Sequence, residues 1–158
     1  MEFFLRYFPM GHKYCQNYRI SRLEKLQDRA LRIINFSKFN EHRNPIYLKF
    51  KILKFNDHIK VLNFLFVHDC INNNIPMSLC DTFVPANKAH KYPTRNADNT
   101  NIVLPKAKTT GAGLNSIKYQ STSIWNSLNS KFTDENFHDR GRSYCKNFIT
   151  NYLLQSYS

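Results

Sequence analysis

The sequence predicts a mainly α-helical fold with a small β-hairpin, an α+β architecture in which a bundle of three to four helices is joined to a strand-turn-helix C-terminal part. Apolar residues recur at three- and four-residue steps in several segments, which is the period of a helix with one buried face. Residues 116–120 instead alternate polar and apolar side chains after Gly111 and Gly113, which indicates a strand after a turn. The chain has 158 residues, 42% of them hydrophobic and 15% aromatic, and this is enough for a core.

Shifts in composition divide the chain into four predicted parts. These are an atypical N-terminal segment (1–18), a basic helical region (19–75), a long loop (76–101), and a hairpin with C-terminal helices packed on the helical region (102–158). The long loop is predicted because its prolines and asparagines interrupt any helical period.

The first predicted helix runs from about Ile20 to Phe36, and Ser21 is expected to cap its start. Its apolar residues are expected to face the core, and they are Leu23, Leu26, Ala30, Ile33 and Ile34. Its other face carries four cations, which we call the basic ridge: Arg22, Lys25, Arg29 and Arg32. Two interpretations of this ridge remain open. It is either a surface that lies along an RNA or DNA backbone or an ordinary solvated helix face.

Two more helices are predicted before the long loop. After a break at Asn44-Pro45, residues 47–55 interleave lysines with aromatic residues and favour a short helix whose aromatic side chains belong to the core. Asn56 is expected to cap the next helix, residues 57–71, which is apolar around most of its circumference and therefore predicted to be the central buried helix. The pairs Asp57-His58 and His68-Asp69 have no accompanying nucleophile, so surface or helix-cap positions are expected for them.

The C-terminal part is predicted to begin with the hairpin. Its two strands are residues 102–104 and 117–119. Ser121 or Thr122 is then expected to cap a short helix in which Trp125, the only tryptophan, is a structural anchor that holds the turn to the core. A final helix is predicted over about residues 137–154, and its inward side chains are expected to be Tyr144, Phe148, Tyr152 and Cys145.

The net charge of +12 is unevenly distributed. Residues 11–60 hold twelve lysines or arginines against four acids, whereas residues 61–100 hold three against three. Such an excess favours polyanionic partners, because each phosphate contact releases counterions without any reading of sequence. The alternative is that AT-rich codons, which also encode the abundant Asn, Ile, Phe and Tyr, raised the lysine content without selection.

No cofactor, metal site, small-molecule substrate or membrane partner is predicted. The four cysteines lack CxxC spacing and fit no zinc module, so reduced and partly buried thiols are expected. No apolar run reaches the ~18 residues that cross a bilayer, and no signal peptide is recognised. These features predict an intracellular protein, nuclear or cytoplasmic, that is not secreted.

Three segments carry a family resemblance. Residues 23–34 have the sequence LEKLQDRALRII, residues 90–95 have HKYPTR, and residues 104–128 have LPKAKTTGAGLNSIKYQSTSIWNSL, in which a basic-Thr-x-x-Gly segment precedes Ser-Ile-x-Tyr and Ile-Trp-Asn-Ser-Leu. In this order and spacing they resemble the region downstream of the reverse transcriptase in jockey-like non-LTR retrotransposon polyproteins. The N-terminal segment departs from that family, because it lacks the usual Gly-Trp-containing lead-in.

The resemblance implies a non-catalytic accessory domain that helps a polymerase core hold RNA or single-stranded DNA. Reverse transcription needs paired palm aspartates, and the only adjacent acids are Asp134 and Glu135 in a polar stretch, so the chain is not expected to be an enzyme. The candidate nucleic-acid-binding residues are Arg22, Lys25, Arg29, Arg32, His90, Tyr92 and Arg95. The alternatives are a structural module that binds a polymerase core or another protein, and a degenerate fragment without selected function.

Overall fold

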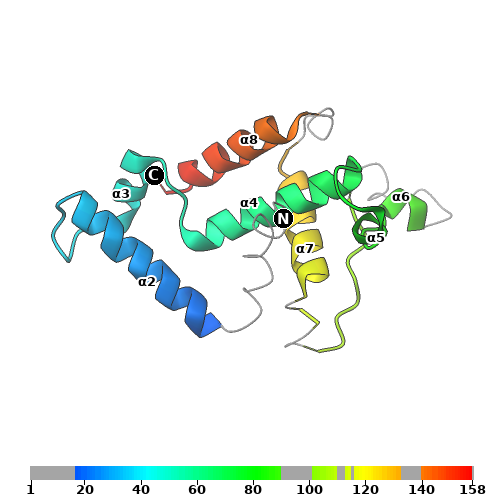
Figure 1. Cartoon of the computed structure of the whole chain (residues 1–158), viewed down its shortest axis with the longest axis horizontal. Coiled ribbons are helices and arrows are strands. Elements are labelled where there is room, and N and C mark those ends of the chain that lie inside the picture. Colours follow the sequence, from blue (N-terminus) through cyan, green and yellow to red (C-terminus); the bar gives the residue numbers. More distant parts are fainter. Residues whose placement is uncertain (1–16, 90–100, 110–112, 115, 133–139, 158) are drawn as a thin grey trace.

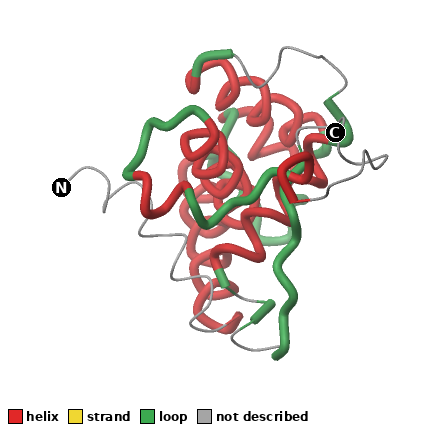
Figure 2. The backbone as a smooth tube through the Cα atoms, turned by 90° about the vertical axis from the view of Figure 1, so that its right-hand side faces the viewer, coloured by secondary structure: helices red, strands yellow, loops and turns green. Residues whose placement is uncertain are grey.

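The computed structural model describes residues 17–89, 101–109, 113–114, 116–132 and 140–157. Within these ranges the fold is all-α, and Figure 2 shows helices and loops without a strand. The helices are α2 (Asn17–Ile34), α3 (Arg43–Phe50), α4 (Phe55–Ile71), α5 (Met77–Cys80), α6 (Ala86–Ala89), α7 (Ile117–Asn129) and α8 (Arg142–Gln155).

Helix α4 is the centre of the fold, as its apolar sequence predicted. It packs against α7, α8, α2 and α5, and Figure 1 shows it crossing the middle of the molecule between α7 and α8. Ten of its residues are buried, including every residue from Asn63 to Cys70. The predicted cap was wrong: Lys54 precedes the helix, and Asn56 lies in its first turn, where its amide binds the Glu24 carboxylate.

Trp125 on α7 is fully buried, which confirms it as a structural anchor. Its ring stacks on Phe64 of α4, with ring centres 4.5 Å apart and planes inclined by 24°. The start of this helix differs from the expectation, because Ser116 and not Ser121 or Thr122 is the cap. The Ser116 hydroxyl accepts the Tyr119 N–H at 3.2 Å and satisfies one of the amides that a helix start leaves without a partner.

The predicted hairpin was wrong. Residues 117–119 form the first turn of α7, because five alternating residues also fit a helix once Ser116 caps it. Ile102 makes an isolated antiparallel bridge with Pro85 instead. On its other side the Asn126 amide accepts the Ile102 N–H at 3.0 Å and donates to the Ile102 carbonyl at 2.8 Å. A side chain of α7 therefore takes the place of the second strand.

Helices α2 and α3 form one side of the molecule. Helix α2 already includes Asn17, so Ser21 is not its cap. Helix α3 begins at Arg43, which corrects the predicted break at Asn44-Pro45, because a proline in the first turn removes an N–H that has no partner in the helix. Tyr47 is 1% exposed, which confirms that this aromatic ring belongs to the core.

A glutamine fixes α2 against the linker between α3 and α4. The Gln27 amide donates to the Leu53 carbonyl at 2.9 Å and accepts the Phe55 N–H at 2.9 Å. The packed side of α2 therefore includes polar residues, with Ile20 and Leu31 as its buried apolar residues.

Helix α8 covers α4 from the side opposite α7 (Figure 1). Cys145 is buried, and Phe148 and Tyr152 pack edge-on against Phe132 at 5.0 and 5.4 Å. Tyr144 was predicted to point inward and is 46% exposed instead, because it lies one residue before the buried face that Cys145 begins. The part of the predicted helix before residue 140 lies outside the described residues.

A buried polar cluster joins α4 to α8 and overturns the surface position expected for His68-Asp69. Both residues are buried, at 1% and 3% exposure. Arg142 of α8 forms an ion pair with the Asp69 carboxylate, and His68 Nε2 donates to the Arg140 carbonyl at 3.1 Å. His58, in contrast, is on the surface as expected.

Candidate nucleic-acid interface

The C-terminal end of α2 presents an aromatic side chain in an unusual way. The Ser37 N–H donates to the Arg32 carbonyl at 3.0 Å and the Phe36 N–H to the Ile33 carbonyl at 3.2 Å, which together form a Schellman motif. Phe36 occupies the left-handed position of this motif, with φ of 53°, where glycine is preferred. Its side chain is 96% exposed. A strained backbone thus holds a large apolar ring in solvent, which is a feature of functional sites.

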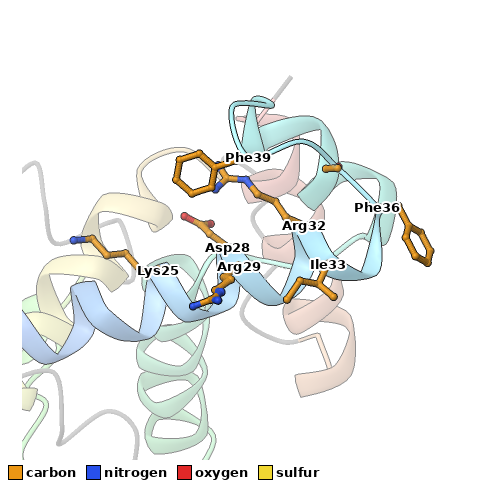
Figure 3. Close-up of a pocket in the computed structure, with 8 residues that line it drawn as sticks. Lys25, Asp28, Arg29, Arg32, Ile33, Phe36 and Phe39 are labelled. Carbon is orange, nitrogen blue, oxygen red and sulfur yellow. The ribbon is translucent and has the colours of Figure 1, made fainter.

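Beside this ring lies an open pocket of about 930 Å³. It combines three cations of the basic ridge with apolar and aromatic side chains, and Figure 3 shows how they project from α2 and the following loop. We call this pocket the basic-aromatic groove, and the residues that matter for its chemistry are Lys25, Arg29, Arg32, Ile33, Phe36 and Phe39. Phe39 is 85% exposed, so two phenylalanine rings are available to a ligand.

Arg32 has a double position in the groove. Its guanidinium lies over the Phe39 ring, 5.7 Å from the ring centre, and its Nη2 lies 3.5 Å from the Glu41 carbonyl oxygen. Arg32 therefore supports the loop that presents Phe39, in addition to contributing charge.

The one carboxylate among the described residues that line the groove is paired with residues of α3. Asp28 accepts hydrogen bonds from Arg43 at 3.0 Å and from the Tyr47 hydroxyl at 2.6 Å. Burial and the bond to Asp28 raise the pKa of Tyr47, so its hydroxyl remains a donor at neutral pH. Asp28 is therefore paired with α3, whereas Lys25 and Arg29 are both exposed on α2.

The predicted ridge is thus partly gathered into one site. Lys25, Arg29 and Arg32 line the groove, whereas Arg22 is exposed one turn earlier and is not part of its lining. The other three predicted residues, His90, Tyr92 and Arg95, lie outside the described residues.

The expected apolar face of α2 is not buried, which corrects the prediction for that helix. Leu26, Ile33 and Ile34 are 61%, 66% and 59% exposed, and Leu23 is 46% exposed. The reason is the orientation of the helix: the face that packs on the rest of the fold holds Ile20, Gln27 and Leu31.

Phe36 and Phe39 were missed as candidate site residues. Phe36 was assigned only as the end of the first helix. The available signal was their setting, because both lie in the polar segment 35–40 (NFSKFN), where buried phenylalanines are unexpected.

The structure also bears on three other features, namely the cysteine thiols, metal-binding clusters and membrane-spanning helices. Cys70, Cys80 and Cys145 form no disulfide, and burial raises the pKa of Cys70 to about 12, which makes its thiol unreactive. In the part of the chain that the structure describes, no three His, Cys, Asp or Glu side chains gather as a metal site. None of the described helices is long and apolar enough to cross a membrane.

Comparisons with known proteins add no relative to this picture. No family model, no curated protein and no solved structure matches the chain.

Proposed function

We propose that this protein is a non-catalytic accessory domain that binds single-stranded nucleic acid, RNA or single-stranded DNA, in the basic-aromatic groove of α2. The observation that supports this best is the combination of Lys25, Arg29 and Arg32 with two phenylalanine rings that are 96% and 85% exposed.

The two kinds of side chain suit the two parts of a single strand. Lysine and arginine bind phosphates, and exposed aromatic rings stack on unpaired bases, which contributes about 1–3 kcal/mol per base. A duplex keeps its bases stacked on each other, so it offers phosphates to the groove without base faces for Phe36 and Phe39. The groove is therefore expected to favour single strands over duplexes.

The family resemblance supports the same function. An accessory domain behind a reverse transcriptase would hold RNA template or target DNA while the polymerase core performs the chemistry. In this proposal the chain contributes affinity and position and has no catalytic residue of its own.

A titration with labelled oligonucleotides tests the proposal. The full chain is titrated against single-stranded RNA, single-stranded DNA and duplex DNA of about 20 nucleotides at several salt concentrations. We expect single strands to bind more tightly than duplex, with affinity that falls steeply as salt rises.

Charge reversal locates the site. Lys25→Glu and Arg29→Glu should each weaken binding at least about tenfold and lower the salt slope. Lys88→Glu makes the same charge change on an exposed lysine of α6 and is the matched control. Equal losses in all three variants would mean that net charge and not the groove determines binding, and this would contradict the proposal.

A further inference from the structure

The side of α2 next to the groove is a narrow apolar surface. Leu23, Leu26, Ala30 and Ile33 are all exposed and recur at alternating steps of three and four residues. This spacing is that of the a and d positions in a coiled-coil heptad, the positions that pack against a partner helix. We call these four residues the apolar stripe.

Positive charge borders the apolar stripe. In the same heptad register Arg22 and Arg29 occupy the g positions, which flank the seam and face charged residues of a partner helix. The acids of α2 are on the other side of the helix and bind within the fold, since Glu24 contacts Asn56 and Asp28 contacts Arg43. A partner of the stripe therefore meets arginines along its flank.

We propose that the apolar stripe docks an amphipathic α-helix of another protein whose apolar seam is flanked by glutamate or aspartate. Such a helix buries leucine-type side chains against Leu23, Leu26 and Ile33 and places its acids beside Arg22 and Arg29.

A second copy of this chain fits the stripe less well. In an antiparallel pair the g positions face each other, which places Arg22 opposite Arg29 of the other copy. In a parallel pair the arginines face Gln27 and Ile34, which occupy the e positions and carry no negative charge. Charge complementarity thus favours an acidic partner over self-association.

The docking surface and the groove share a border. Arg29 and Ile33 project from the same side of α2 in Figure 3 and belong to both surfaces. Leu23 and Leu26 belong only to the stripe, whereas Lys25 belongs only to the groove. Substitutions at Leu23 or Leu26 therefore test helix docking alone, and a substitution at Lys25 tests nucleic-acid binding alone.

Binding of designed helical peptides to the full chain tests the proposal. The probe is a labelled peptide of about 20 residues with leucine at a and d and glutamate at e and g, measured by fluorescence anisotropy. One control peptide has lysine in place of glutamate, and another has serine in place of leucine. We expect both controls to bind at least about tenfold more weakly than the acidic peptide.

Variants of the chain locate the contact. Leu23→Gln and Leu26→Gln replace exposed side chains and should weaken acidic-peptide binding at least about tenfold while leaving affinity for single-stranded RNA unchanged. Met77 lies on α5 and is 74% exposed. The control variant Met77→Gln should therefore bind the peptide as the wild type does. A chain that binds the acidic peptide but does not bind RNA would contradict the proposed function and leave the docking proposal standing.

Four results would overturn the docking proposal. The first is equal binding of the acidic and lysine peptides. The second is a concentration-dependent dimer that Leu26→Gln abolishes, which would identify a second copy as the occupant. The third is peptide binding that appears only after residues 1–16 are removed, which would identify that segment as the occupant of the stripe. The fourth is binding of phosphatidylserine vesicles that Leu26→Gln abolishes in the absence of peptide binding.

Discussion

The guanidinium of Arg32 lies 5.7 Å from the centre of the Phe39 ring, so a cation of α2 supports an aromatic ring of the loop that follows it. The same guanidinium lies 3.5 Å from the Glu41 carbonyl oxygen. Charge and ring are thus presented together in the basic-aromatic groove, and the Phe39 ring remains 85% exposed.

Arg32→Lys is expected to weaken single-strand binding about three- to tenfold without changing the net charge, because lysine lacks the planar group that lies over Phe39. The measurement is the dissociation constant for a single-stranded RNA at fixed salt. Arg29→Lys is the matched control and should retain affinity, since Arg29 contributes charge in this account. Equal effects of the two substitutions would show that the Arg32–Phe39 contact has no part in binding.

Trp125→Ala is expected to lower the free energy of unfolding by about 3–5 kcal/mol, because it empties the fully buried site against Phe64. Urea unfolding followed by circular dichroism measures the change. Met77→Ala, at an exposed position, should stay within about 0.5 kcal/mol of the wild type. A small loss in Trp125→Ala would mean that α7 does not depend on this contact.

The two histidines of α4 predict opposite effects of pH on stability. The hydrogen bond with Cys145 raises the pKa of His68 despite its burial, so the fold favours the protonated ring. The contribution of protonated His68 to stability is complete below the ordinary pKa of about 6.5 and is lost as pH rises through the higher pKa of the folded state. Partial desolvation of the His58 ring by its neighbours and the charge of Lys146 lower the pKa of His58, so the contribution of neutral His58 to stability is present above about pH 6.5 and is lost on acidification.

Thermal unfolding between about pH 5 and 8 checks these signs. His68→Gln should remove the decline in stability toward high pH, whereas the control His58→Gln should remove the decline toward low pH. Identical pH profiles for the two variants and the wild type would refute the assignment.

Burial was predicted correctly where the apolar residues of a single helix were sufficient to indicate it. Helix α4 is apolar around most of its circumference and is the buried centre, and Trp125 is the anchor that its size and apolar neighbours predicted. The all-α character of the described residues follows the helical periods, with the short alternation at residues 116–120 as the exception that Ser116 explains.

The errors arose where distant contacts decide the outcome. Periodicity identified α2 as amphipathic, but its packed face depends on hydrogen bonds from Gln27 to Leu53 and Phe55, more than twenty residues away. Asp69 is buried because Arg142 of α8 pairs with it. The apolar face was therefore expected inside and lies outside, and the exposed Phe36 was not expected to be a site residue.

The ring of Phe36 is exposed at a backbone position that favours glycine. Phe36→Gly relieves the left-handed strain, so we expect the free energy of unfolding to rise by up to about 1 kcal/mol. Lys51→Gly, at the equivalent end of α3 with φ of 52°, should stabilise the fold similarly and serves as the control for strain.

The most direct test measures stability and single-stranded RNA affinity together on Phe36→Gly. We expect a protein that is at least as stable as the wild type and binds RNA about tenfold more weakly, since one stacking ring contributes about 1–3 kcal/mol. A stabilised Phe36→Gly protein that binds RNA as tightly as the wild type would contradict the proposed function, because the strained, exposed ring would then have no role in binding.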